Sequence, residues 1–471
     1  MITLDWFVFI FYFAILGYLI TVSGRARTSS EFSVGSREIP GTIVFATLSA
    51  TFVGPGYSMG LANKVANNGI VWLPIFAAFS LQTVLVGLFV ASRLRQVPNA
   101  KTLGDVMGNK YGRLVQVLSG ALSVALCAGI VGAIARAGGD ILNSFTGLPI
   151  FASVVITTAT VIVYSWYGGI KTVILTDTIQ FIIFAIAIPF VAIGIVWHGG
   201  TGIFAEPMVT QKLAISSSFG GIEIMGMFLA FLLGETLIPP YANRALVARN
   251  PKSASNAFIF AGIFSLAWFT VCALIGILFA EGISQGENVF LNAVRQTLPS
   301  GLIGLVYASM ACIIMSSQDS LLNAASVSFT NDIVGKMSSR SINPRLQIAL
   351  DRWLTLVIGV VAVGVAITAP NVIDALMYCY TLWAPTVVLP LILAVTLKRV
   401  YPYAGFAAIL AGGITTIIWE WGLKNPFGVP SILLGIIANQ VAFWALQLLS
   451  RPCKLHPWFV PITTNNEFET Q

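Results

Sequence analysis

Five polar residues recur along one apolar stretch in the second half of the chain. They are Ser316, Ser317, Asp319, Ser320 and Asn323. Their spacing from Ser316 places most of these oxygens on one face of a helix. Hydroxyl and carboxylate oxygens suit a hard cation such as Na⁺. Serine and asparagine also hydrogen-bond between membrane helices, so a structural role stays open, but an ionisable residue within a span indicates function.

Four more charged residues interrupt apolar stretches: Asp177, Glu235, Arg136 and Asp140. Arg136 and Asp140 are four residues apart, so they could pair along one helix and simply neutralise each other. Alternatively, the guanidinium of Arg136 could hold the carboxylate of a solute, whose shape it matches. The sequence leaves both interpretations open.

The composition indicates that all of these residues lie in an integral membrane protein. Of the 471 residues, 57% are hydrophobic and 9% are charged, and the mean hydropathy is +0.87. Soluble domains carry about 25% charged residues. We therefore predict an all-α membrane protein of about thirteen transmembrane helices. The apolar runs cover 5–22, 40–61, 70–92, 114–144, 149–167, 173–197, 222–240, 256–280, 301–332, 353–369, 372–397, 403–422 and 430–449.

The basic residues predict the orientation of these spans. Of the 25 lysines and arginines, 20 fall in alternate loops, Arg244 and Arg352 among them, and in the C-terminal tail. The opposite loops hold Lys64, Lys212, Arg295 and Lys424. By the positive-inside rule, the N-terminus lies outside and the C-terminus lies in the cytoplasm. The net charge of +7 therefore reflects topology in a cell (inner) membrane, and we expect no nucleic-acid partner.

Two spans contain helix-breaking residues at similar places. The first has Gly54, Pro55 and Gly56 in its middle, and the second has Gly234 followed by Pro239 and Pro240. Glycine and proline let the backbone unwind, which is tolerated at membrane depth where carbonyls line a cavity or bind a ligand. Each break could be a simple kink. As a matched pair, they are typical of transporters built from inverted repeats.

Three segments resemble the sodium:solute symporter family, which includes proline, sugar, sialic-acid and choline transporters. The first runs from Arg37 and Pro40 through Ala50 and Val53 to Gly60. The second is Gly168, Gly169, Thr176, Asp177 and Gln180, and the third is Ser316 and Ser317 followed by a polar helix that ends near Thr330 and Asp332. Asn243 to Leu246 are also similar to the family's Gln-Arg-x-Leu element.

The resemblance implies a single transporter domain with a leucine-transporter-like fold and ten core helices. The expected parts are a peripheral first helix at 5–22, a first repeat at 40–197, an inverted second repeat at 222–397, two peripheral helices at 403–449 and a cytoplasmic tail at 450–471. It also implies Na⁺ as the co-transported ion.

The resemblance further implies a sodium site and a second cation site. The sodium site would use the backbone carbonyls of Ala50, Val53 and Ile313 with the hydroxyls of Ser316 and Ser317. The second site would involve Ser316, Asp177, Asp319 and Ser320. Asp319 departs from the small or hydroxyl residue usual in the family, which could strengthen a cation site or introduce a protonatable group.

The positions that face the solute in sugar-transporting relatives correspond to Phe52, Tyr57, Phe231 and Glu235, but these lack the relatives' polar pattern. Our main hypothesis is Na⁺-coupled symport of a small zwitterionic or anionic solute, such as an amino acid or a carboxylate. Arg136 would hold its carboxylate and Glu235 its amine. Proton coupling through Asp319 or Glu235 is the alternative. A membrane sensor and an intramembrane enzyme are remote, because the chain shows no signalling domain and neither histidine lies mid-span.

Overall fold

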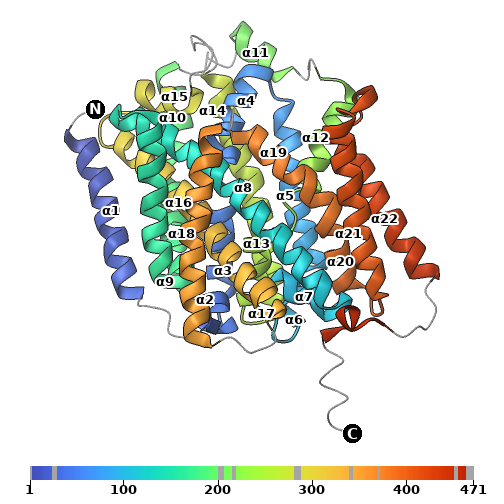
Figure 1. Cartoon of the computed structure of the whole chain (residues 1–471). Helices are drawn as coiled ribbons and strands as arrows, with labels where there is room; N and C mark the ends of the chain where they lie inside the picture. Colours follow the sequence, from blue (N-terminus) through green and yellow to red (C-terminus); the bar gives the residue numbers. More distant parts are fainter. Residues whose placement is uncertain are drawn as a thin grey trace.

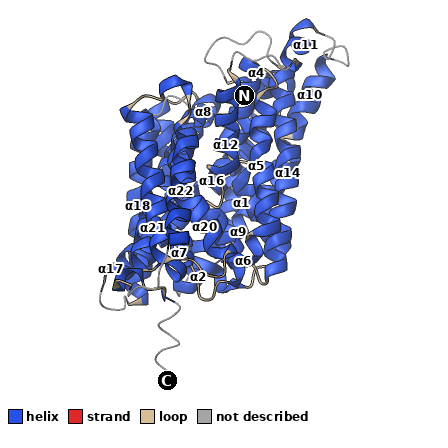
Figure 2. Cartoon of the chain, turned by 90° about the vertical axis from the view of Figure 1, so that its right-hand side faces the viewer, coloured by secondary structure: helices blue, strands red, loops and turns tan. Residues whose placement is uncertain are grey.

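The computed structural model describes residues 3–23, 29–199, 206–214, 219–279, 288–338, 343–368, 372–449 and 455–462. These residues form helices that run roughly side by side, and they contain no strand (Figures 1 and 2). Within them, nine helical segments are long and apolar enough to cross a membrane, and four shorter apolar helices accompany them. Together they match the thirteen predicted spans.

The spans are built from the following helices. The first half contains α1 (Thr3–Ser23), α3 (Gly41–Phe52), α4 (Leu61–Asn68), α5 (Trp72–Phe89), α8 (Arg113–Thr146), α9 (Ile150–Ala187) and α10 (Pro189–Gly199). The second half contains α12 (Gly221–Leu233), α13 (Pro239–Val247), α14 (Pro251–Leu278), α16 (Leu302–Ser328), α18 (Pro344–Thr368), α19 (Val372–Trp383), α20 (Leu389–Thr396), α21 (Pro402–Ile417) and α22 (Ser431–Leu449).

Short helices close the two ends of the bundle. They are α2 (Ser29–Val34), α6 (Ala91–Gln96), α7 (Leu103–Tyr111) and α17 (Gly335–Met337) at one end, and α11 (Pro207–Leu213) and α15 (Val289–Thr297) at the other (Figure 1). The start of α1 and the described segment 455–462 lie at opposite ends, as an odd number of spans requires. The rest of the predicted tail, 450–454 and 463–471, lies outside the described residues.

The two predicted breaks are present. α3 ends at Phe52, and the chain turns through Val53, Gly54 and Pro55 before helical structure resumes at Gly56. α12 ends at Leu233, and α13 begins only at Pro239. Between them, Leu237 adopts φ +52°, a strained conformation for a non-glycine residue. Such strain marks a segment whose shape is imposed by its surroundings.

A third break divides one long helix. Within α9, Gly169 has φ +66° and ψ −166°, so 150–168 and 169–187 are two helices that meet at an angle. Only glycine adopts this conformation without penalty. A β-carbon there would also lie 2.7 Å from the ring of Phe32, which packs against the bend. This glycine separates the two spans that the sequence analysis placed at 149–167 and 173–197.

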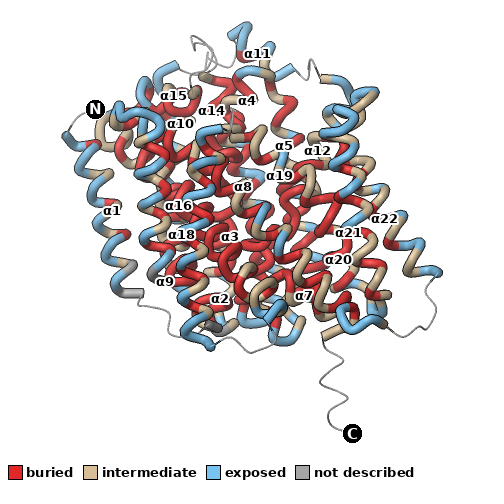
Figure 3. The backbone as a smooth tube through the Cα atoms, in the orientation of Figure 1, coloured by how far each residue is buried: buried red, intermediate tan, exposed pale blue. Residues whose placement is uncertain are grey.

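Burial separates a central group of helices from a peripheral one (Figure 3). The segment Leu302–Met337 includes α16, and 78% of the residues in its apolar 18-residue stretch are buried. In the corresponding stretch of α22, 22% are buried. α3, α9 and α13 all contact α16. The polar face of Ser316, Ser317, Asp319, Ser320 and Asn323 is therefore enclosed by protein rather than facing lipid.

The peripheral helix α1 is attached to α16 at its outer end. The Asp5 carboxylate accepts hydrogen bonds from the backbone N–H groups of Gly301 (2.7 Å) and Gly304 (3.0 Å), at the N-terminus of α16. An acidic side chain here satisfies free amides and complements the helix dipole. Further along α1, the hydroxyl of Tyr12 accepts from the Gln180 amide (2.9 Å) of α9. The first helix thus contacts the centre of the protein.

The segments that flank the two broken helices meet at the end that carries α6 and α7. The N–H of Ile39 donates to the carbonyl of Val247 (3.1 Å), and the N–H of Arg249 donates to the carbonyl of Ile39 (2.9 Å). Arg37 donates to the carbonyl of Arg95 (2.8 Å). Partial burial lowers the pKa of the Arg37 guanidinium, and the positive charge of Arg95 lowers it further. These hydrogen bonds connect the segment before α3 with the C-terminal end of α13.

Candidate functional site

The serine pair on α16 faces the break that follows α3. The Ser316 hydroxyl lies 3.0 Å from the carbonyl oxygen of Ala50 and 3.2 Å from that of Ile313. The Ser317 hydroxyl lies 3.4 Å from the carbonyl oxygen of Thr51. All of these residues except Thr51 are almost completely buried, and Thr51 is 5% exposed. The structure thus brings hydroxyl and carbonyl oxygens of two helices into one small region.

Most of the predicted sodium ligands lie in this region. Ala50, Ile313 and Ser316 are in direct contact, and Ser317 lies beside them against Gly54. The carbonyl of Val53 instead accepts a hydrogen bond from the Ser58 hydroxyl (2.9 Å). Since a carbonyl oxygen has two lone pairs, this bond leaves one for a cation. The described residues contain no group of three or more His, Cys, Asp or Glu side chains arranged for a metal ion, so the arrangement is one of neutral oxygens.

A buried ion pair between α13 and α9 lies beside Ser320, one helical turn beyond Ser316 on α16. The Arg244 guanidinium of α13 donates to the carboxylate of Asp177 (2.9 Å) and to the hydroxyls of Ser320 (2.6 Å) and Thr47 (3.2 Å). Thr47 also donates to Asp177. The side chains of Arg244 and Asp177 are 1% and 0% exposed. One guanidinium thus links α3, α9, α13 and α16 in the interior of the protein.

Arg244 is predicted from the sequence to lie in a loop, and this prediction is wrong. It lies in α13 and is completely buried, because the short helix after the second break folds back into the bundle and carries the side chain inward. Arg352, also counted as a loop residue, is 8% exposed within α18. Hydropathy could not reveal this, since an arginine near the end of a span has the same signal whether it faces water or a buried carboxylate.

Asp319 lies on α16, next to Ser320, but it is not part of the ion pair between Arg244 and Asp177. Its carboxylate accepts from the hydroxyls of Tyr164 (2.9 Å) and Ser320 (3.3 Å). Tyr164 lies also 2.9 Å from the carbonyl oxygen of Met315. Among the described residues, none of the three ion pairs involves Asp319. Two carboxylates, Asp177 and Asp319, therefore lie near one guanidinium in a water-poor interior.

Glu235 lies in the second break and is surrounded by aromatic side chains. Its carboxylate accepts hydrogen bonds from the hydroxyls of Tyr57 and Tyr241. Phe52 packs edge-on against Tyr241 with ring centroids 4.5 Å apart, and Phe231 contacts Tyr57 at 5.8 Å. Phe52, Tyr57, Phe231 and Glu235, predicted as solute-facing residues, are therefore in one cluster.

A cavity of about 20 Å³, here called the inner cavity, lies beside this cluster. Its lining includes Glu235, Tyr57, Tyr241 and Tyr380, and also Thr51 and Ser317. The serine that faces the first break thus lines the same space as the glutamate of the second break. The sequence analysis missed Tyr241 and Tyr380, because a tyrosine in an apolar helix carries no signal that separates packing from binding.

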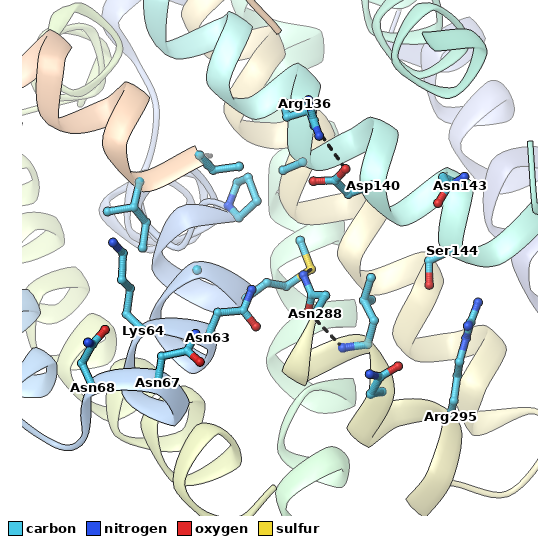
Figure 4. Close-up of a pocket in the computed structure, with 18 of the residues that line it drawn as sticks. Asn63, Lys64, Asn67, Asn68, Arg136, Asp140, Asn143, Ser144, Asn288 and Arg295 are labelled. Carbon is cyan, nitrogen blue, oxygen red and sulfur yellow. Dashed lines mark hydrogen bonds and ion pairs between the residues drawn. The ribbon is translucent and has the colours of Figure 1, made fainter. Parts of the chain in front are cut away.

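Arg136 lies elsewhere. It pairs with Asp140 on the same helix (3.3 Å), as one of the two interpretations predicted. Both line a much larger cavity of about 920 Å³, here called the outer cavity, at the end of the bundle that carries α4 and α15 (Figure 4). Arg136 is not among the residues that line the inner cavity. The structure therefore does not bring Arg136 and Glu235 into one small site.

The arrangement of broken helices, buried oxygens and two adjacent cavities in a helical bundle is typical of a membrane transporter. Residues 32–412 match the model of the sodium:solute symporter family, and the chain belongs to this family. It is therefore a multi-pass membrane protein that couples solute symport to Na⁺, and not an enzyme.

Relatives with curated names support the same class. The chain is 23% identical to the high-affinity proline transporter PutP of Bacillus subtilis, over 91% of this chain and 94% of the relative. It is 24% identical to the sodium/glucose cotransporter 1 of Ovis aries (94% and 78%) and 22% identical to the sodium/pantothenate symporter of Escherichia coli (91% and 95%).

Solved structures show the same fold. A Na⁺-coupled sialic acid symporter in a substrate-bound, outward-open state superimposes with a TM-score of 0.80 at 18% identity, over 96% of this chain and 99% of that chain. A nucleobase-cation-symport-1 family transporter in a closed conformation gives a TM-score of 0.62 at 13% identity, over 93% and 98%. The predicted leucine-transporter-like fold is confirmed.

Proposed function

We propose that this symporter carries a small zwitterionic solute, such as an amino acid, and that Glu235 binds its amino group. The observation that carries this proposal is the buried carboxylate of Glu235 beside the inner cavity, within hydrogen-bonding reach of two tyrosines. A buried carboxylate favours a cationic partner, and aromatic faces favour an ammonium group further. The proline transporters among the relatives support an amino acid. A purely anionic solute finds no basic side chain among the residues of this cavity.

We propose that Na⁺ binds between the first break and α16, held by the carbonyls of Ala50, Val53 and Ile313 and the hydroxyls of Ser316 and Ser317. The close approach of Ser316 to Ala50 and Ile313 supports this set. Because Ser317 also lines the inner cavity, a cation there would order the wall of the solute site. Sodium and solute would then stabilise the same conformation, which is the basis of coupling.

We also propose a second cation site at Ser316, Asp177, Asp319 and Ser320. The two carboxylates of this site have different partners. Arg244 already neutralises Asp177 and donates to Ser320. Asp319 is the carboxylate that would hold a cation here. This feature also favours the second candidate function, proton coupling, because a proton would neutralise Asp319 equally well. Uptake driven by a pH gradient without Na⁺ would establish proton coupling, and uptake that requires Na⁺ at constant pH would exclude it.

We infer that the two broken helices begin two inverted repeats of five spans, 40–197 and 222–397, with α1, α21 and α22 outside them. The matched breaks and their meeting beside one cavity support this division. We further infer that the end with α6, α7 and α17 faces the cytoplasm of a cell (inner) membrane. The presence there of Arg93, Arg95, Lys101, Lys110 and Lys336 supports this inference, under which the N-terminus and the outer cavity would lie outside.

Reconstituted proteoliposomes test the function directly. We expect an inward Na⁺ gradient to drive uptake of radiolabelled amino acids, screened individually, and replacement of Na⁺ by choline to reduce the rate at least tenfold. Uptake that is unaffected by the replacement would contradict sodium coupling. Saturable Na⁺-driven uptake of a simple carboxylate or a sugar, with no competition from any amino acid, would contradict the proposed solute class.

The sodium site has its own test. Ser316→Ala and Ser317→Ala each remove one oxygen ligand, and we expect each to raise the Na⁺ concentration for half-maximal uptake about tenfold, because a hydrogen-bond or ligand oxygen for a charged group contributes roughly 1.5–3 kcal/mol. Ser309→Ala is the matched control, since this buried serine of α16 bonds to its own helix at Leu305. Unchanged sodium dependence in both variants would contradict the site.

A further inference from the structure

The outer cavity is lined by polar faces of three separate helical segments. α4 contributes Asn63, Lys64, Asn67 and Asn68. α8 contributes Arg136, Asp140, Asn143 and Ser144. The segment at α15 contributes Asn288, Asn292 and Arg295. On each segment these residues recur three or four apart, so each helix turns a polar face in one direction. Figure 4 shows labelled members of all three faces around one space. Such convergence in a protein that is 57% hydrophobic indicates a site for a polar ligand.

Hydrogen bonds between the helices hold the walls of this cavity together. The side-chain oxygen of Asn63 on α4 accepts from the N–H of Val289 on α15 (2.9 Å). The hydroxyl of Tyr307 on α16 lies 3.0 Å from that of Ser144 on α8 and accepts from the Nε of Arg295 (3.1 Å). The position of Arg295 is thus set by two neighbouring helices. The cavity is a built feature rather than a loose surface hollow.

The charges of the outer cavity do not balance within it. Lys64 pairs with Asp374 (3.4 Å), and Arg136 pairs with Asp140 through its Nε (3.3 Å). Arg295 donates its Nε to a neutral phenol, and no carboxylate of the described residues lies within ion-pair distance of it. Among the described residues that line the cavity, three are basic and one is acidic, and Arg295 is the basic one without a carboxylate partner in that part of the chain. The lining therefore attracts an anionic group.

We propose that the outer cavity is a first binding site for the carboxylate of the solute, held by the guanidinium group of Arg295, with Arg136 as a second basic side chain on the cavity wall. Each uses its Nε within the protein, and the terminal nitrogens form the fork that matches a carboxylate. The surrounding asparagines supply neutral donors. This inference rests on the proposed zwitterionic solute. It gives a role to Arg136, which lines the outer cavity and is not among the residues that line the inner cavity.

The two cavities are adjacent, because Pro55 at the first break lines both. The outer cavity of about 920 Å³ accommodates a whole amino acid, whereas the inner cavity of about 20 Å³ holds no more than a water molecule in this conformation. A zwitterion held by its carboxylate in the outer cavity would have its ammonium group free to move toward Glu235 once the break opens. The outer cavity thus selects for a carboxylate before the inner cavity selects for an amine.

A weak anion probe tests this site on the full chain, purified in detergent. Binding of 3,3,3-trifluoropropionate is measured by broadening of its ¹⁹F resonance, at constant ionic strength, beside the uncharged 3,3,3-trifluoropropionamide. We expect the carboxylate to bind and the amide not to bind. Arg295→Gln should raise the dissociation constant of the carboxylate about tenfold, and Arg136→Gln should raise it by a smaller factor. The control Arg399→Gln removes the same charge from an exposed loop position and should leave it unchanged.

Four results would overturn the proposal: no carboxylate binding, equal binding of the amide, binding unaffected by both arginine variants, or complete displacement by chloride at equal concentration, which would make this a simple halide site. The outcome is separable from that of the proposed function. The probe experiment needs neither Na⁺ nor transport, and binding should persist in Glu235→Gln. Loss of Na⁺-driven uptake with intact probe binding contradicts the function alone, and the reverse contradicts the outer site alone.

Discussion

Replacing Arg244 with leucine is expected to destabilise the protein by about 3–5 kcal/mol, the usual effect of leaving one member of a buried ion pair without its partner. Asp177 would remain in an interior where its side chain is 0% exposed, with hydroxyl groups such as that of Thr47 as neutral donors in place of the guanidinium. Ser320 would lose its bond to the guanidinium as well. Thermal unfolding of the purified variant in detergent measures the change, with exposed Arg399→Leu as the control.

The double variant Asp177→Asn, Arg244→Leu distinguishes a charge effect from a packing effect. Without the carboxylate, the loss of the guanidinium leaves no buried charge, so the double variant should be more stable than Arg244→Leu alone. Arg244→Lys should stay destabilised, because the single nitrogen of an ammonium group does not reproduce the spread of the guanidinium, whose Nε and Nη2 reach acceptors on three helices. A double variant no more stable than the single one would contradict this account of the pair.

Replacing Glu235 with glutamine is expected to remove most solute transport while the protein still folds. The amide has the same shape and can still accept from one of Tyr57 and Tyr241, so the loss of stability should be small. The solute's ammonium group would lose its charged partner, which costs roughly 2–5 kcal/mol for a buried pair. This corresponds to a roughly thirtyfold or greater rise in the solute concentration for half-maximal uptake.

The matched control is Glu223→Gln, on the exposed first turn of α12, the helix that precedes the break holding Glu235. It changes the same functional group away from the inner cavity and should transport like the unaltered protein. The Na⁺ concentration for half-maximal uptake, measured at saturating solute, should change little in Glu235→Gln, since none of the sodium ligands is altered. If solute affinity is unchanged while Na⁺ or proton dependence shifts strongly, Glu235 is an ion-coupling residue and the solute assignment fails.

The sequence by itself determined the class of protein and the membrane spans, and it predicted the polar face of α16. Hydrophobic runs of membrane length and the scarcity of charge leave few alternatives, because a polar backbone can cross lipid only as a helix or a closed barrel. The breaks at Gly54–Gly56 and Gly234–Pro239 were readable, since glycine and proline act on the backbone locally. The face of Ser316, Ser317 and Asp319 was readable because helical periodicity fixes which residues share a side.

Tertiary structure alone decided which charged groups meet. Arg136 and Asp140 could be paired from their spacing, since both lie on one helix. Asp177 and Arg244 are 67 residues apart on different helices, and only the fold brings them to 2.9 Å. The same holds for Glu235, whose partner Tyr57 comes from the other broken helix. Contacts between helices depend on packing angles and depth, which no local pattern encodes. The inner cavity and the outer cavity are therefore visible only in three dimensions.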